Sequence, residues 1–209
     1  MKTNTSIVYN TEYRFIVEMI EPGSSVLDLG CGNGDLLAIL KNERNITRSQ
    51  GIEIDERAIY ECVAKGVSVF HGDIDSGLSE YSDKSFDYVI LNQTFQQVKK
   101  PDIVLKEALR VGGKVIVGFP NFAYLTARFH LAIRGRAPIT KSLPYEWYNT
   151  PNIHFLSIGD FWDYCKKREI KIEKACYLGK SKTVRFLPNV FALLGVFLIV
   201  KNGIEKSNS

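Results

Sequence analysis

The residue types that could bind a small charged ligand are concentrated in residues 26–34, which read VLDLGCGNG. An acid, Asp28, lies in an apolar run, and Gly30, Gly32 and Gly34 follow at every second position. Glycine lacks a β-carbon, so a ligand can approach the backbone of such a loop closely. A carboxylate beside open backbone suits a ligand that is cationic and polar. This stretch therefore predicts a binding loop for a nucleotide-type ligand.

Three ligands of that type compete for the loop. A phosphate-binding P-loop needs the pattern G-x-x-x-x-G-K-[ST]. The triplet Gly179, Lys180, Ser181 does not fit it, because residue 174 is Lys where the leading glycine belongs. A dinucleotide loop needs G-x-G-x-x-G, and Asp35 stands at its third glycine position, which argues weakly against NAD. The remaining ligand is S-adenosylmethionine, or S-adenosylhomocysteine.

The loop closely resembles the D-x-G-x-G-x-G loop of class I methyltransferase-like proteins. In such a loop Asp28 is expected near the methionyl ammonium, either directly or through water. The backbone of residues 30–34 is expected to give room to the methionine and ribose portions of the ligand.

Polar residues also follow the next predicted strands. Glu53 ends the second strand and can accept both ribose hydroxyl hydrogens, with Ile54 packing on the adenine. Asp73 follows the third strand and could accept from the adenine amino group, while Asn92 and Gln93 follow the fourth. Taken singly, each acid equally fits a turn or a solvated strand end. The expected cofactor-binding residues are Asp28, Gly30, Cys31, Gly32, Gly34, Glu53, Ile54, Asp73, Ile74, Asn92 and Gln93.

Strands and helices alternate along the chain. Apolar runs predict strands at 25–29, 49–54, 67–71, 86–91 and 114–119, and a hairpin-like pair at 171–177 and 193–200. Helical periodicity and capping residues predict helices at 11–20, 34–42, 56–65, from Pro101 onward, 123–134 and 157–167. This order predicts an α/β fold, doubly wound, with a mostly parallel sheet that is covered by helices on both faces.

Composition limits the function classes. The 209 residues fit a single domain, and 45% hydrophobic with 24% charged residues is typical of a globular protein. The net charge of +4 comes without a dense Lys/Arg stripe, so we expect no nucleic-acid partner. The four cysteines form no C-x-x-C pair, so we expect neither a metal site nor disulfides, and a cytoplasmic location. Residues 186–200 are apolar but too short for a membrane span of about 20 residues.

Residues 120–156 interrupt the alternation and are too long for an ordinary connection. The stretches FPNF (119–122) and ITKSLPYEWYNTPNIHFLSIGDF (139–161) resemble the MetW family of methionine biosynthesis proteins. The segments GIEID, FDYVILNQTFQQV and RVGGKVIVGFPN fit the same family in order, so the resemblance covers the chain from about residue 16 to residue 200.

The resemblance implies a Rossmann-like, seven-stranded class I methyltransferase-like sheet and a role in methionine biosynthesis. MetW-type proteins are linked to MetX-type homoserine O-acyltransferases, and in parts of the family MetW acts as a needed partner of that enzyme. The resemblance therefore implies a homoserine O-acyltransferase as the partner, without establishing that methyl transfer occurs.

The residues that would carry out methyl transfer are hard to find. Gln93, Thr94, Gln96 and Gln97 follow the fourth strand, and none of them titrates. That stretch also lacks the N/D-P-P-[YF] tetrapeptide and the Pro-Cys pair that methylation of amino groups and of cytosine C5 use. The catalytic residues remain unassigned. The chain is expected to be a cofactor-binding partner of the acyltransferase, with an active small-molecule methyltransferase as the alternative.

The inserted segment at about 120–156 admits three interpretations. It could cover the ligand as a lid, it could pack its aromatic residues against the sheet, or it could present a partner surface, where Tyr, Trp and Arg are enriched. The residues concerned are Tyr145, Trp147, Tyr148, Asn152 and His154, together with Arg128, Arg134 and Arg136 on the adjoining helix.

Overall fold

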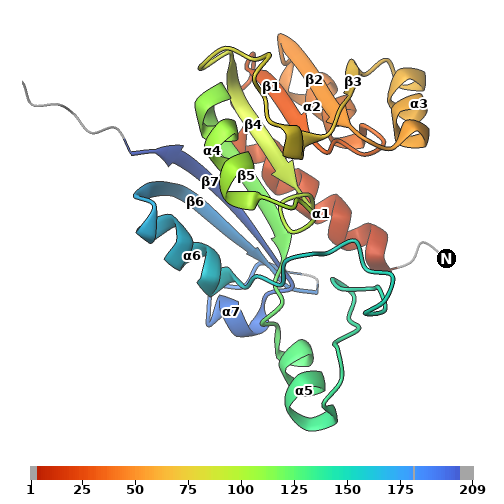
Figure 1. Cartoon of the computed structure of the whole chain (residues 1–209), viewed down its shortest axis with the longest axis vertical. Helices are drawn as coiled ribbons and strands as arrows, with labels where there is room; N and C mark the ends of the chain where they lie inside the picture. The colour runs from red at the N-terminus through yellow and green to blue at the C-terminus, as the bar shows by residue number, and fades with distance from the viewer. Residues whose placement is uncertain (1–3, 181, 203–209) are drawn as a thin grey trace, which may run out of the picture.

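The computed structural model describes residues 4–180 and 182–202, with side chains described from residue 12 onward. Its strands form one seven-stranded sheet in the order β3-β2-β1-β4-β5-β7-β6 (Figure 1). The first five strands pair in parallel, and β7 runs antiparallel to both β5 and β6. The predicted fold class is confirmed. The strands are β1 (Ser25–Leu29), β2 (Arg48–Glu53), β3 (Val69–His71), β4 (Phe86–Asn92), β5 (Gly112–Pro120), β6 (Ile170–Leu178) and β7 (Leu194–Lys201).

Helices cover both faces of the sheet, because alternate strand residues point to opposite sides. On one face, α4 and α6 bury Leu105 and Phe161 against β1, β4, β5 and β7. On the other face, α1, α2 and α3 bury Ile16, Leu37 and Cys62. The helices are α1 (Asn4–Met19), α2 (Asp35–Arg44), α3 (Glu56–Ala64), α4 (Pro101–Val111), α5 (Leu125–Arg134), α6 (Ile158–Lys167) and α7 (Pro188–Phe191), with a 3-10 turn η1 (Ile74–Ser76).

Local sequence signals fix where several helices begin. The side chain of Asp55 accepts hydrogen bonds from the amides of Arg57 and Ala58 at the start of α3. Ser157 caps α6 in a reciprocal capping box with Asp160. These caps satisfy amide groups that lack partners within their helices.

The order of the strands reverses at β1, whose two neighbours are β2 and β4. The segments that follow β1 and β4 turn to opposite sides of the sheet. A crevice therefore forms between them at the carboxyl ends of the strands, where open α/β sheets bind ligands. Glu53 and Asn92 end β2 and β4, and Asp28 lies one residue before the end of β1. The sheet therefore brings the predicted polar residues to one edge.

Asn121 connects this edge to the long segment that follows β5. It is fully buried, and its Nδ2 donates to the carbonyls of Ala192 at 2.9 Å and Asn189 at 3.2 Å. Its Oδ1 accepts from the amides of Ala123 and Ile158. Beyond this junction, α5 projects from the sheet, and the segment that follows it returns alongside (Figure 1).

We expect Asn121→Ala to lower the free energy of unfolding by about 2–4 kcal/mol, because it leaves buried amide and carbonyl groups without partners. Urea denaturation measures the change. The matched control is Asn149→Ala, since Asn149 is exposed and its loss is expected to cost less than about 0.5 kcal/mol. Equal stability of the two variants would contradict the role given to Asn121.

Candidate functional site

A cavity of about 460 Å³ opens at the carboxyl ends of β1, β2 and β4. The glycine loop after β1, the end of β2, the turn after β3 and the loop after β4 form its walls. Its volume and its mixture of apolar and polar groups suit a small ligand. The lining residues are Tyr13, Asp28, Gly30, Cys31, Gly32, Asn33, Leu36, Ile52, Glu53, Ile54, Gly72, Asp73, Ile74, Asp75, Asn92, Gln93, Thr94, Gln97, Val98 and Lys99.

The glycine loop needs glycine at two of these positions. Gly30 and Gly32 have φ values of 75° and 54°, in the left-handed region that other residues rarely adopt. Gly30 also packs against the loop after β4, since a β-carbon there would lie 2.6 Å from Thr94 Oγ1. The loop thus exposes backbone to the cavity while staying close to the β4 side.

The carboxylate of Glu53 holds this loop to the end of β2. Its Oε2 accepts a hydrogen bond from the Gly32 amide at 2.8 Å. Its Oε1 accepts from the amides of Ile54 and Asp55 at 2.8 and 3.0 Å. Each carboxylate oxygen has two lone pairs, so these three amides leave Oε2 able to accept from one hydroxyl group of a ligand in the cavity.

Asp28 lies at the floor of the cavity and is only 3% exposed. Burial raises its pKa to about 7, and the nearby charge of Glu53 adds to this rise. A buried carboxyl group in this state gains from a cationic partner, which would return its pKa towards the ordinary range. The geometry and charge of Asp28 therefore suit a ligand ammonium group.

The cavity brings together all but one of the predicted cofactor-binding residues, and the exception is Gly34. Gly34 begins α2 with a φ of 76°, and a β-carbon there would lie 2.9 Å from Cys62 Sγ. Helix packing and turn geometry thus explain why residue 34 is glycine.

Cys31 lines the cavity. Its side chain also packs against Gly51, where a β-carbon would overlap it, and burial raises the pKa of its thiol.

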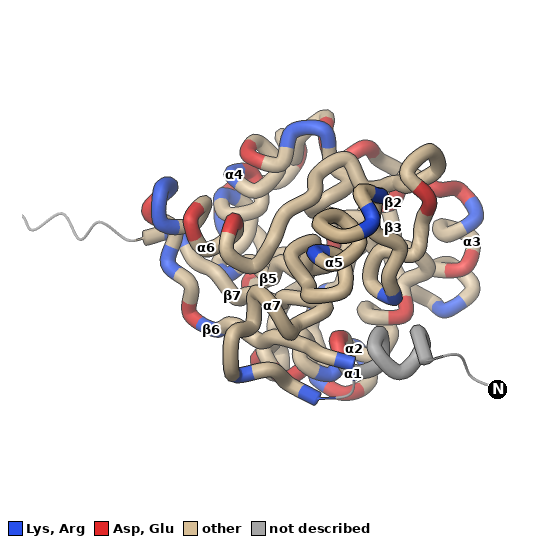
Figure 2. Tube along the Cα trace, turned by 90° about the horizontal axis from the view of Figure 1, so that it is seen from below, with Lys and Arg blue, Asp and Glu red and all other residues tan. Residues whose placement is uncertain are grey.

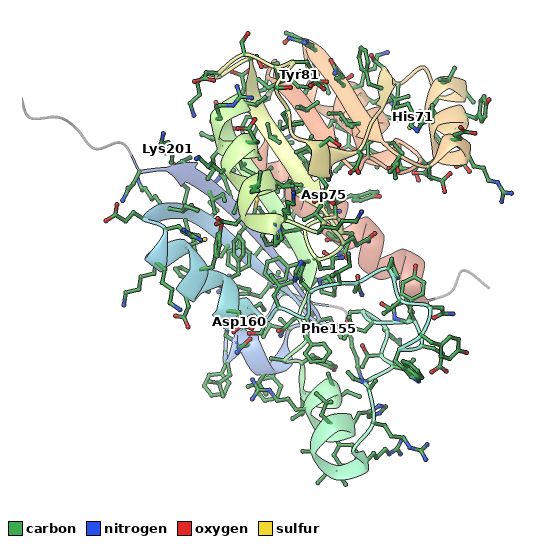
Figure 3. The ribbon with its side chains drawn as sticks, viewed as in Figure 1. His71, Asp75, Tyr81, Phe155, Asp160 and Lys201 are labelled. Carbon is green, nitrogen blue, oxygen red and sulfur yellow. The ribbon has the colours of Figure 1, made fainter. Side chains whose placement is uncertain are left out.

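The turn after β3 contributes a residue that the sequence analysis missed. Asp75 accepts hydrogen bonds from the amides of Lys99 and Lys100 at 2.9 and 3.0 Å, so it joins this turn to the loop before α4 (Figure 3). Asp73 also lines the cavity, where one of its carboxyl oxygens accepts from the Asp75 amide at 2.9 Å. The sequence of the short strand β3 did not indicate that Asp73 and Asp75 would line the same wall of the cavity.

The first helix contributes a second missed residue, Glu12, which is fully buried. Its Oε1 accepts a hydrogen bond from Gln93 Nε2 at 2.9 Å. Burial raises its pKa to about 7, against the lowering effect of that hydrogen bond. A signal was present in the sequence, since Glu12, Ile16 and Ile20 recur at four-residue spacing and therefore share one helix face.

The inserted segment does not line the cavity. Tyr145, Trp147, Tyr148, Asn152 and His154 are absent from the cavity walls, so the structure does not place them as a lid. The backbone of this segment is attached to the loop after β4, because the amides of residues 153 and 154 both donate to the Gln96 carbonyl, at 2.9 and 3.0 Å.

Apolar side chains are exposed along α5 and the returning segment, and we call this region the α5 surface. Trp147, Tyr148 and Ile133 are 75%, 70% and 70% exposed. An apolar groove of about 220 Å³ lies between α5 and the returning segment, with Phe155 in its wall (Figure 3). Viewed from this end, the tube around α5 is mostly tan, and acidic and basic residues are spread around it (Figure 2). The α5 surface comprises Leu125, Phe129, Leu131, Ile133, Ile139, Tyr145, Trp147, Tyr148, Ile153 and Phe155.

The described residues contain neither a metal-binding cluster nor a membrane-spanning helix. Within residues 4–180 and 182–202, no group of three or more His, Cys, Asp or Glu side chains could hold a metal ion. No helix in the same residues is long and apolar enough to cross a membrane.

Comparison with solved structures identifies the fold. A methyltransferase from Thermotoga maritima that depends on S-adenosylmethionine superposes with a TM-score of 0.67 at 22% identity, covering 95% of this chain and 91% of that one. Magnesium protoporphyrin IX methyltransferase from Synechocystis, with bound S-adenosylhomocysteine, gives a TM-score of 0.66 at 15% identity, covering 95% of this chain and 85% of that one. The fold is that of class I methyltransferases.

Sequence comparison identifies the family. A bifunctional methionine biosynthesis protein MetXA/MetW from Rhodopirellula baltica is 36% identical over 193 residues, which cover 88% of this chain and 31% of that protein. The chain thus spans about a third of the length of the curated relatives it matches. The family model of the methionine biosynthesis protein MetW matches residues 10–199. The chain belongs to the MetW family of methionine biosynthesis proteins.

Proposed function

We propose that this chain binds S-adenosylmethionine or S-adenosylhomocysteine in the cavity and acts with, or regulates, a MetX-type homoserine O-acyltransferase. The observation that carries the proposal is the fused relative, in which one polypeptide bears both names and its MetW portion aligns with 88% of this chain. Fusion places two proteins at a high effective concentration, which is useful when the two work together. We expect both to act in the cytoplasm.

The cavity supports the cofactor part of the proposal. In this proposal Asp28 binds the methionyl ammonium, Glu53 the ribose hydroxyls and Asp73 the adenine amino group. All three line one cavity at the switch point of the sheet. The remaining site assignments, which include Ile54, Ile74, Asn92 and Gln93, belong to the same proposal.

The α5 surface supports the partner part. Exposed apolar areas of this kind, with aromatic residues at their centre, are typical of protein interfaces. The inserted region carries Arg128, Arg134, Arg136 and Lys141 against a single acid, Glu146. We therefore expect the acyltransferase to present an apolar patch with an acidic rim.

The deciding experiment is co-purification of this chain with the MetX-type acyltransferase of the same organism, with acyltransferase activity measured with and without adenosylmethionine. We expect a stable complex whose activity differs from that of the acyltransferase alone. If the two proteins make no contact and the activity is unchanged, the partner role fails.

An active small-molecule methyltransferase is a second candidate function, and the cavity favours it, because Asp28, Glu53 and Asp73 all line it at the switch point of the sheet. Adenosylhomocysteine production over a panel of metabolites tests this candidate. Zero turnover despite measured cofactor binding would count against it.

Glu53→Ala is expected to weaken binding of adenosylmethionine by about 1.5–3 kcal/mol, because it removes a charged hydrogen-bond acceptor for the ribose. Isothermal titration calorimetry measures the change. Glu43→Ala is the matched control, since Glu43 is exposed on α2 and outside the cavity. An unchanged affinity in Glu53→Ala would show that the ribose lies elsewhere.

Binding of adenosylhomocysteine is expected to depend on pH through Asp28. The ligand ammonium favours the carboxylate, so binding releases a proton while Asp28 is protonated in the free protein. Affinity should therefore rise with pH, by up to about tenfold per pH unit, and level off above pH 7. Asp28→Asn should remove most of this dependence, and Asp163→Asn, an exposed control on α6, should retain it. A flat profile in the unsubstituted protein would contradict this assignment.

Replacing both Trp147 and Tyr148 by Ala is expected to weaken acyltransferase binding by about 2 kcal/mol or more, since exposed aromatic anchors dominate interfaces. Adenosylhomocysteine binding should stay unchanged, because neither residue lines the cavity. Tyr60→Ala is the matched control, since Tyr60 is 73% exposed on α3, outside the α5 surface. Full partner affinity in the double variant would place the interface elsewhere.

A further inference from the structure

The carboxyl ends of β4 and β5 hold two buried side chains with oxygen atoms that lack a hydrogen-bond donor. Glu12 Oε2 and Asn92 Oδ1 are buried, and no described residue donates to either of them. Buried polar atoms are normally paired. Since both unpaired atoms are oxygens that accept, a hydrogen-bond donor would satisfy them.

Gly118 allows these two side chains to converge. A β-carbon at position 118 would overlap Asn92 Oδ1 and would lie 3.1 Å from Glu12 Oε1. The carboxyl group of Glu12 and the amide oxygen of Asn92 therefore meet over the same backbone position of β5. Two acceptors that face each other repel unless a proton or a donor lies between them.

Gln93 connects this cluster to the cavity. It lines the cavity, and its Nε2 donates to Glu12 Oε1 at 2.9 Å. Its φ of 57° lies in the left-handed region, which is uncommon for a residue other than glycine and is often found at functional sites. The Gln93 amide donates to the Gly118 carbonyl at 2.8 Å, which holds this backbone in place. Asn92 lines the cavity as well.

Glu12 has no cationic partner among the described residues. The causes of its raised pKa are burial and, in the opposite sense, the hydrogen bond from Gln93. The groups known to face it from β4 and β5 are the amides of Asn92 and Gln93 and the backbone of Gly118, and its neighbour Tyr13 lines the cavity. Glu12 can therefore compensate a positive charge brought to this end of the cavity, in addition to the cavity-lining Asp28, whose strand β1 pairs with β4.

We propose that Glu12, Asn92 and Gln93 form a subsite at the β4 end of the cavity that receives a protonated amine of a small molecule. An ammonium group offers three donors and no acceptor, which suits the unpaired Asn92 Oδ1 in the cavity wall. Asn92 and Gln93 contact the amine, and Glu12 supplies the compensating charge from behind Gln93. This inference rests on the proposed cofactor function, since it places the amine beside the part of the ligand from which a methyl group would be transferred.

The test compares two ligands by isothermal titration calorimetry between pH 6 and pH 8. Sinefungin carries an amine-bearing carbon where adenosylmethionine carries its methylsulfonium group, and adenosylhomocysteine lacks that amine. Both ligands share the methionyl ammonium, so their affinity ratio cancels the contribution of Asp28. We expect the preference for sinefungin to increase about tenfold from pH 6 to pH 8, as Glu12 loses its proton to make room for the cation.

Glu12→Gln should remove the pH dependence of this ratio and weaken sinefungin about tenfold at pH 8, with adenosylhomocysteine affinity unchanged. Glu12→Asp should restore part of the pH dependence, which a purely structural role for Glu12 would not require. Glu18→Gln is the control, because Glu18 lies on the same helix but is exposed. Thermal melts establish that each variant is folded.

The outcomes separate the two proposals. Normal adenosylhomocysteine binding with no preference for sinefungin, or a pH-dependent preference that persists in Glu12→Gln, overturns the amine subsite and leaves the cofactor cavity standing. Failure of both ligands to bind the unsubstituted protein overturns the cofactor cavity and the subsite together.

Discussion

The hydrogen bond between the Gly32 amide and the carboxylate of Glu53 is the contact on which the arrangement of the site depends. At 2.8 Å it joins the loop after β1 to the end of β2, and the other oxygen of the same carboxylate holds the first residues after β2. A charged acceptor with several backbone donors is a strong contact in a partly buried setting. The glycine loop can therefore stay open to a ligand without losing its shape.

Two buried carboxyl groups, Asp28 and Glu12, flank this loop and the loop after β4, respectively. Burial raises the pKa of each to about 7. A carboxyl group with a raised pKa makes the folded protein less stable as pH rises from about 4 to about 7, because the folded form must then hold a buried charge. Neither residue is explained by stability alone. Under the proposals above, the arrival of cationic groups of a ligand beside Asp28 and in front of Glu12 offsets this cost.

Much of the fold could be predicted because its signals are local. Apolar runs define β1 and β4, Asp55 and Ser157 mark helix starts, and the acids at the strand ends come together because the strands are parallel.

Glu12 was missed because its role depends on the side of the sheet against which α1 packs. The apolar periodicity of ten residues does not specify that side. The sequence does not show whether Gly34 serves the ligand or the helix, because helix packing and ligand approach both require glycine. The placement of the α5 surface depends on the buried junction at Asn121, which links residues distant in sequence.

The attachment of the inserted segment to Gln96 has a thermodynamic consequence. The Gln96 carbonyl accepts from the backbone at residues 153 and 154, and the Gln96 side chain donates to the Gln93 carbonyl at 2.9 Å. One short chain of hydrogen bonds therefore runs from the cavity wall to the α5 surface. If a ligand and a partner bias this chain towards the same arrangement, each raises the affinity of the other by the same factor, as linkage requires. The affinity of the partner for the α5 surface would then depend on the concentration of the ligand in the cavity, without any chemical reaction.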